Sequence, residues 1–137
     1  MMENEARPAT PCALVVDDDG LIRMDAADIL EEAGFQVIEA RHGDEALEVL
    51  RERYEVITLL FSDVHMPGDH DGFALARHTA EHWPHISIVI ASGRATPGPD
   101  DIPANARFVA KPFSAEVVRR HLRRVLPDEQ QPEPLRR

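Results

Sequence analysis

Short apolar runs alternate with stretches of helical periodicity along most of this 137-residue chain. Five runs fit strands, at residues 13–16, 36–40, 56–61, 86–91 and 108–110. Several are almost continuously Val, Ile and Leu, as is typical of strands covered on both faces. Alternating strands and helices predict a parallel sheet with helices on both faces and right-handed crossovers. The sequence therefore predicts an α/β fold with a doubly wound five-stranded sheet.

Prolines and polar residues indicate where regular structure stops. Residues 94–107 contain three prolines and a glycine, so we expect the fourth helix to be short or irregular, a loop with one helical turn at most. Residues 1–12 and 127–137 are polar and contain prolines. We expect both ends to be flexible. A single domain over residues 13–126 remains between them.

The composition excludes several functions. The chain has 25 acidic and 15 basic residues, a formal net charge of -10, which disfavours direct binding to nucleic acid or to an anionic membrane. We find no apolar run long enough to span a bilayer and no signal-peptide core at the N-terminus. Cys12 is the single cysteine, so no internal disulfide can form and a cytoplasmic location is expected.

Polar residues whose side chains can bind ions or take part in catalysis follow the predicted strands. The first strand is followed by Asp17, Asp18 and Asp19, the third by Asp63, the fourth by Ser92 and the fifth by Lys111. In open parallel sheets, ligands bind beyond the carboxyl ends of the strands, where the strand order reverses. We therefore expect carboxylates, a hydroxyl and an ammonium group from four strands to meet at one edge of the sheet.

The chemistry of such a cluster follows from its groups. Carboxylates held together repel each other and favour a bound cation. Oxygen ligands without Cys or His at zinc spacing favour Mg²⁺ or Mn²⁺. A lysine and a hydroxyl opposite the metal suit the remaining oxygens of a phosphoryl group, whose transfer depends on positioning and charge neutralisation. Because the sequence has no Gly-rich nucleotide loop, a carboxylate such as Asp63 could itself be the nucleophile.

Four motifs at these strand ends resemble the receiver domains of response regulators in two-component signalling. They are VVDDD (15–19), DVHMPG (63–68) with DG (71–72), ASG (91–93) and KPF (111–113). The resemblance covers residues 13–126. Each motif alone is weak, but all four occur in order, each at a strand end. The resemblance implies a flavodoxin-like sheet with strand order 2-1-3-4-5.

The resemblance also implies roles for these residues. Asp63 would accept a phosphoryl group from a sensor histidine kinase or phosphotransfer protein. Mg²⁺ would be bound by Asp17, Asp18, Asp63 and the backbone carbonyl of His65. Ser92 and Lys111 would contact the phosphoryl group, and the Lys111–Pro112 bond would be cis.

Three further positions are implied by the same resemblance. Phe108 occupies the aromatic switch position, whose side chain moves with that of Ser92. His65 and Arg94 occupy positions that tune the lifetime of the acyl phosphate. We hypothesise that Arg94 reaches the phosphoryl group or His65.

A receiver of this kind would be a binding switch and not an enzyme. With no output domain after residue 126, it would act on an unknown downstream protein, or serve as a phosphorelay intermediate or phosphate sink. Phosphorylation could also drive homodimer formation. One alternative is a Mg²⁺-dependent phosphohydrolase with an aspartyl nucleophile, although Leu21 occupies its usual Thr/Val position and no cap domain is present. A second is a flavodoxin-like domain that binds phosphate or a flavin, which the acidic edge disfavours.

Several features have simpler interpretations. Asp19 fits a helix N-cap. His78 and His82, with His85 nearby, fit a solvated helix face better than a zinc site, since no hydrolase motif surrounds them. Four arginines near the C-terminus form a basic patch that is either solvated or pairs with an acidic partner: Arg119, Arg120, Arg123 and Arg124.

Overall fold

The computed structural model describes residues 10–68, 71–94, 98 and 102–136. Five parallel strands form one sheet in the order β2-β1-β3-β4-β5. In chain order they are β1 (Cys12–Val16), β2 (Gln36–Ala40), β3 (Ile57–Asp63), β4 (Ser87–Ser92) and β5 (Ala106–Ala110). The predicted fold class and strand order are confirmed.

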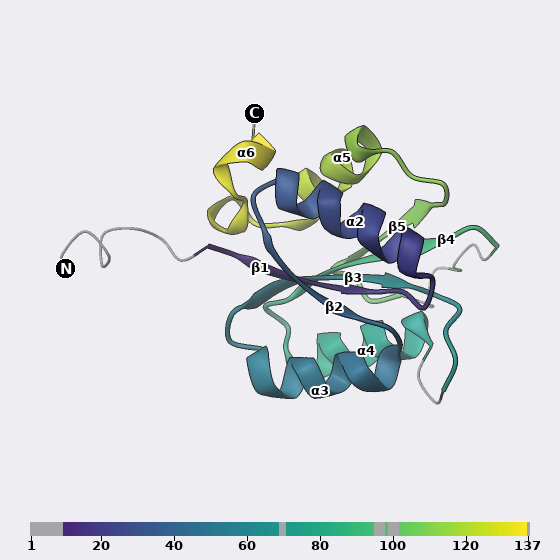
Figure 1. Cartoon of the computed structure of the whole chain (residues 1–137). Coiled ribbons are helices and arrows are strands. Elements are labelled where there is room, and N and C mark those ends of the chain that lie inside the picture. The colour runs from purple at the N-terminus through teal and green to yellow at the C-terminus, as the bar shows by residue number, and fades with distance from the viewer. Residues whose placement is uncertain (1–9, 69–70, 95–97, 99–101, 137) are drawn as a thin grey trace.

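Helices cover both faces of the sheet (Figure 1). One face carries α2 (Gly20–Glu32) and α5 (Ala115–Val125), and the other carries α3 (Gly43–Arg53) and α4 (Gly72–His82). Successive side chains of a strand point to opposite faces. In β3, Leu59 and Phe61 therefore join the core under α2 and α5, whereas Leu60 joins the core under α3 and α4. The apolar runs of the sequence are continuous because the central strands supply both cores.

The segment between β4 and β5 is only partly described, and the irregular form that its prolines predicted can be compared only with those residues. Residues 93, 94, 98 and 102–105 contain no helix. Residues 95–97 and 99–101 lie outside the described part of the chain. β5 begins at Ala106, two residues earlier than predicted.

The C-terminal residues differ from the flexible tail that we expected. After α5 come a short 3-10 helix, η1 (Asp128–Gln130), and α6 (Glu133–Arg136), with Leu135 fully buried against the α2–α5 core. Gln131 Nε2 donates to the carbonyl oxygens of Arg123 and Leu126, 3.0 Å away in each case. One buried leucine and these bonds therefore hold residues 128–136 against the domain, although the segment is polar in composition. At the other end, Cys12 belongs to β1, and residues 1–9 lie outside the described part.

The four arginines of the basic patch fall into two pairs that differ in their contacts. Arg119 and Arg123 donate hydrogen bonds to the backbone carbonyls of Pro134 and Leu135. These two arginines therefore hold the C-terminal segment, a structural role that neither interpretation of the patch included. Arg120 and Arg124 are exposed, so both interpretations stay open for them.

The histidines do not assemble a metal centre in the described residues. The rings of His78 and His82 stack on α4 with centroids 4.0 Å apart. His85 lies beyond the helix, with Nε2 2.8 Å from the Tyr54 carbonyl oxygen. The group of potential metal ligands that the described residues do form consists of three carboxylates, those of Asp17, Asp18 and Asp63. No described helix has the length and apolar character needed to cross a membrane.

Candidate phosphoryl-transfer site

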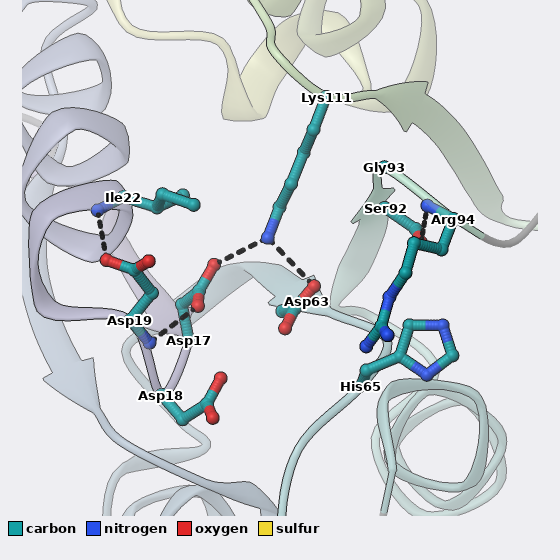
Figure 2. A pocket seen from close by; sticks show the side chains of 10 residues that line it. All are labelled: Asp17, Asp18, Asp19, Ile22, Asp63, His65, Ser92, Gly93, Arg94 and Lys111. Carbon is teal, nitrogen blue, oxygen red and sulfur yellow. Dashed lines mark hydrogen bonds and ion pairs between the residues drawn. The ribbon is translucent and has the colours of Figure 1, made fainter.

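The polar residues that end four strands line one cavity at the carboxyl edge of the sheet (Figure 2). The cavity has a volume of about 400 Å³. Its lining residues are Asp17, Asp18, Asp19, Ile22, Asp63, His65, Ser92, Gly93, Arg94 and Lys111. The sheet therefore brings together the strand-end residues of β1, β3, β4 and β5, as their sequence positions indicated.

Lys111 connects two buried carboxylates at the centre of the cavity. Its Nζ donates to Asp63 Oδ1 at 2.9 Å and to Asp17 Oδ2 at 3.0 Å. The side chains of Asp17 and Asp63 are only 6% and 9% exposed. Asp17 Oδ1 accepts the Asp19 amide at 2.9 Å, whereas Asp63 Oδ2 accepts no hydrogen bond from the described residues (Figure 2). That oxygen therefore faces the cavity without a hydrogen-bond donor among the described residues.

Burial and charge shift the protonation equilibria of this pair. Burial raises the pKa of Asp17 above its ordinary 3.8, and the negative charge of Asp63 adds to this, against the opposing hydrogen bonds from Asp19 and Lys111. Burial acts to lower the pKa of Lys111, but its bonds to Asp63 and Asp17 outweigh burial and raise this pKa above 10.5. Lys111 therefore remains an ammonium ion at neutral pH, while Asp17 is more easily protonated than a free aspartate.

Three carboxylates fit a hard divalent cation. Asp17, Asp18 and Asp63 each offer an oxygen atom, and these atoms lie within 4.8 Å of one another. Oxygen-only donors suit Mg²⁺, which keeps water and phosphate oxygens at its other positions. Asp18 is exposed, so a cation here would remain accessible to a phosphoryl donor. His65 lines the same cavity, which is the position from which its carbonyl was predicted to act.

The turn after β3 holds Asp63 in place. Gly72 donates its amide to the Val64 carbonyl at 2.8 Å, and the Asp71 side chain caps α4 by accepting the Ala74 amide at 2.8 Å. A Cβ at Gly72 would lie 2.0 Å from the carbonyl oxygen of Asp63. The Asp-Gly pair therefore places the start of α4 directly against the backbone of Asp63.

Ser92, Arg94 and His65 form the opposite wall of the cavity. Ser92 is buried, with 2% of its surface exposed, and its Oγ accepts the Arg94 amide at 3.1 Å. The Arg94 side chain extends beside the imidazole of His65 (Figure 2). The geometry thus places both predicted tuning residues at the mouth of the cavity.

Two other predicted residues lie outside the cavity lining. Phe108 is half-buried and packs against the core under α3 and α4. The Lys111–Pro112 peptide bond is cis. Pro112 instead borders a second, smaller cavity of about 230 Å³ together with Ile22, Asp25, Lys111 and Phe113. Leu21 and Met24, whose apolar side chains are exposed, lie on α2, the helix that carries Ile22 and Asp25.

Sequence reasoning missed Arg23. Its Nη1 donates to the Asp17 carbonyl oxygen at 2.9 Å, and its Nε donates to Glu39 Oε1 at 2.9 Å. No motif marks this residue, because the contact depends on a long side chain that folds back onto the preceding loop. The sequence contains a single indication of this contact, an arginine in the first turn of the helix that follows the acidic run.

Comparison with known proteins agrees with this geometry. The family model described as "Response regulator receiver domain" matches residues 13–123. This chain belongs to the response-regulator receiver family. The predicted resemblance to this family is confirmed.

Two curated relatives differ in how much of them the chain covers. The sensor kinase CckA of Brucella abortus (strain 2308) is 36% identical over 104 residues, which are 74% of this chain and 11% of the kinase. The response regulator receiver protein CpdR of the same strain is 37% identical over 103 residues, 73% of this chain and 83% of CpdR. The similarity to the kinase is thus confined to a small part of that protein.

Solved structures show the same fold. The receiver domain of the hybrid histidine kinase CckA superposes with a TM-score of 0.72 at 29% identity, over 85% of this chain and 99% of that domain. The chemotaxis protein CheY4 of Vibrio cholerae gives a TM-score of 0.74 at 27% identity, over 86% of this chain and all of CheY4, 100%. Both comparisons cover nearly the whole receiver unit.

Proposed function

We propose that this receiver is a Mg²⁺-dependent phosphorylation switch whose acceptor is Asp63. The observation that carries the proposal is the pairing of Asp63 with Lys111 through one carboxylate oxygen while the other oxygen faces the cavity. Family membership supports the same chemistry. A histidine kinase or phosphotransfer protein is the proposed donor, because the chain is similar to the receiver part of a sensor kinase and to the receiver protein CpdR.

The residues of the cavity divide the transfer between them. Asp63 Oδ2 attacks the phosphorus of the donor phosphohistidine, and the new P–O bond forms as the P–N bond breaks and its electron pair returns to the imidazole. Lys111 holds Asp63 in place before transfer and neutralises phosphoryl oxygens afterwards. Bound Mg²⁺, held by Asp17, Asp18 and Asp63, would neutralise charge on the transferring group. Hydrolysis of the acyl phosphate restores the carboxylate.

Phosphorylation would be read as a change of shape. The Ser92 hydroxyl accepts the Arg94 amide and would donate its own proton to a phosphoryl oxygen by turning toward it. Phe108, which packs against the core under α3 and α4, would move with Ser92. The protein would then change its affinity for a downstream protein, or for a second copy of itself, and would not turn over an external substrate. A cytoplasmic location agrees with the single, buried thiol of Cys12.

The test is Mg²⁺-dependent phosphorylation by a small donor. Purified protein is incubated with acetyl phosphate or phosphoramidate, with and without Mg²⁺, and its intact mass is recorded beside that of an Asp63→Asn variant. We expect wild type to gain one phosphoryl group only with Mg²⁺, and the variant to gain none. A gain of the same size in the variant would place the acceptor elsewhere. If wild type binds Mg²⁺ but gains no phosphoryl group, the proposed phosphorylation by small donors is wrong.

Arg94 is proposed to protect the acyl phosphate. Its side chain covers the mouth of the cavity beside His65 (Figure 2), where a guanidinium group can bind a phosphoryl oxygen and hinder the approach of water. We expect Arg94→Ala to lose its phosphoryl group several-fold faster than wild type in a chase without donor. An unchanged half-life of the acyl phosphate in Arg94→Ala would exclude this protective role. The half-life in His65→Ala shows whether His65 protects the acyl phosphate independently of Arg94.

A further inference from the structure

Arg23 connects three elements behind the acidic loop. It lies in the first turn of α2, and its own amide donates to the Asp19 carbonyl at 2.9 Å. Its guanidinium folds back to donate to the Asp17 carbonyl at 2.9 Å and to Glu39 on β2 at 2.9 Å. The Arg23 side chain is 20% exposed, so most of it is enclosed. One side chain therefore fixes the loop to both a helix and a strand.

The contact bears on the orientation of the acidic residues. The Asp17 carbonyl belongs to the peptide group that also contains the Asp18 amide, so a bond to that oxygen restricts the rotation of the peptide plane. That plane sets the direction of the Asp18 side chain, which is exposed and makes no described contact of its own. The Asp17 side chain is already held by Lys111 and by the Asp19 amide. Asp18 therefore depends on the backbone for its position.

We propose that Arg23 is a positioning residue for the metal site: it holds the Asp17–Asp18 peptide group so that the Asp18 carboxylate stays directed at Asp63. This inference rests on the proposed Mg²⁺ chemistry and adds a residue outside the cavity lining. Glu39 orients the guanidinium from the far side. Groups that orient metal ligands typically change metal affinity by about 10- to 100-fold when they are removed.

The sign of the effect separates positioning from simple electrostatics. Arg23 is a cation whose guanidinium contacts the backbone of the loop that carries Asp17 and Asp18. If it acted only through its charge, its removal would strengthen Mg²⁺ binding, because a repulsive positive charge would be lost. If it positions Asp18, its removal weakens binding in spite of the more negative site. The two explanations predict opposite changes for the same variant.

The measurement is Mg²⁺ binding to the full chain by isothermal titration calorimetry, without any phosphoryl donor. Arg23→Met keeps the apolar stem and removes every donor, and we expect its Kd for Mg²⁺ to rise about 10-fold. Arg23→Lys keeps the charge and one donor but cannot bridge two acceptors as a guanidinium does, so it should lie between wild type and Arg23→Met. Urea unfolding without Mg²⁺ shows whether each variant is folded.

Arg41 provides the matched control. It follows β2 at the same edge of the sheet, its side chain is 70% exposed, and it pairs with Glu45 at 3.5 Å without contact to the acidic loop. Arg41→Met therefore changes the charge alone, and its Kd should equal or fall slightly below that of wild type.

The outcomes distinguish this inference from the function on which it rests. Weaker binding by Arg23→Met than by Arg41→Met, with partial recovery in Arg23→Lys, supports positioning. Equal or tighter binding by Arg23→Met overturns the inference and leaves the proposed function intact. Should Arg23→Met fail to fold, wild-type affinity in Arg23→Lys would overturn the inference in the same way. No Mg²⁺ binding by wild type would overturn both.

Discussion

Replacing Lys111 with methionine is expected to slow phosphorylation of Asp63 by about 100-fold or more, which is the usual cost of removing one preorganised donor from a transition state. Lys111 contacts the carboxylate of Asp63, the proposed acceptor, at 2.9 Å. Without it, no ammonium group is held against Asp63 to neutralise the phosphoryl oxygens as the P–O bond forms. The initial rate of mass gain with acetyl phosphate at saturating Mg²⁺ measures this loss.

The same variant should bind Mg²⁺ at least as tightly as wild type. In wild type the ammonium occupies Asp63 Oδ1 and Asp17 Oδ2, so it competes with a cation for the same carboxylates. Lys111→Met thus separates metal binding from phosphoryl transfer, which Asp63→Asn cannot do because it removes a metal ligand as well. If Lys111→Met is phosphorylated at the wild-type rate, Lys111 has no part in the transfer.

Removing Lys111 should also make stability depend more strongly on pH. Two mostly buried carboxylates would face each other unpaired, and breaking a buried pair in this way costs about 3 kcal/mol. The pKa of Asp17 is already raised by burial. A raised carboxyl pKa means that the folded state binds more protons than the unfolded state, so stability falls as the pH rises above the ordinary value of 3.8. The deficit of Lys111→Met in urea unfolding without Mg²⁺ should therefore be largest near pH 7.5 and shrink toward pH 4.5.

Wild type should show the complementary behaviour at alkaline pH. The folded-state pKa of Lys111 lies above 10.5, so its stabilising contribution is complete below that value and is lost as the pH rises through the folded-state pKa. Lys111→Met has no group to lose there. The unfolding curves of the two proteins should accordingly converge at both extremes of pH.

The site could be predicted from the sequence because it depends on topology. Parallel strands direct their carboxyl ends to one edge, so Asp17, Asp63, Ser92 and Lys111 were expected to meet wherever the exact strand ends fell. The predicted limits were in fact one or two residues off: β3 and β4 extend to Asp63 and Ser92 themselves. Such errors do not separate the groups, because the sheet fixes their relative positions.

The contacts of Arg23 and of the C-terminal segment could not be predicted, because they do not depend on topology. Their contacts depend on single side chains that have no periodic pattern. Arg23 reaches a backbone carbonyl six residues earlier, and the Leu135 side chain enters the core from a segment otherwise made of Pro, Asp, Glu, Gln and Arg. Composition described that segment correctly as polar, yet one buried residue was enough to hold it.

Leu135→Ala is expected to lower the free energy of unfolding by about 3 kcal/mol, within the range found for large-to-small substitutions in protein cores. Leu135 is 0% exposed and belongs to the core shared by α2, α5 and the sheet. The C-terminal segment also packs on the turn after α2, since a Cβ at Gly34 would be 2.5 Å from Pro132 and 3.1 Å from Pro134. Urea unfolding monitored by circular dichroism measures the loss.

Leu21→Ala is the matched control for this change. Leu21 lies on α2 with 78% of its surface exposed, so the same truncation should change stability by less than about 0.5 kcal/mol. Phosphorylation of Leu135→Ala by acetyl phosphate should proceed at the wild-type rate while the protein is folded. The reason is that α6 lies near the amino ends of the strands (Figure 1), whereas the cavity is lined by residues at their carboxyl ends. Equal stability of the two variants would show that residues 128–136 are not packed in solution. A slowed phosphorylation of folded Leu135→Ala would instead reveal coupling between this segment and Asp63.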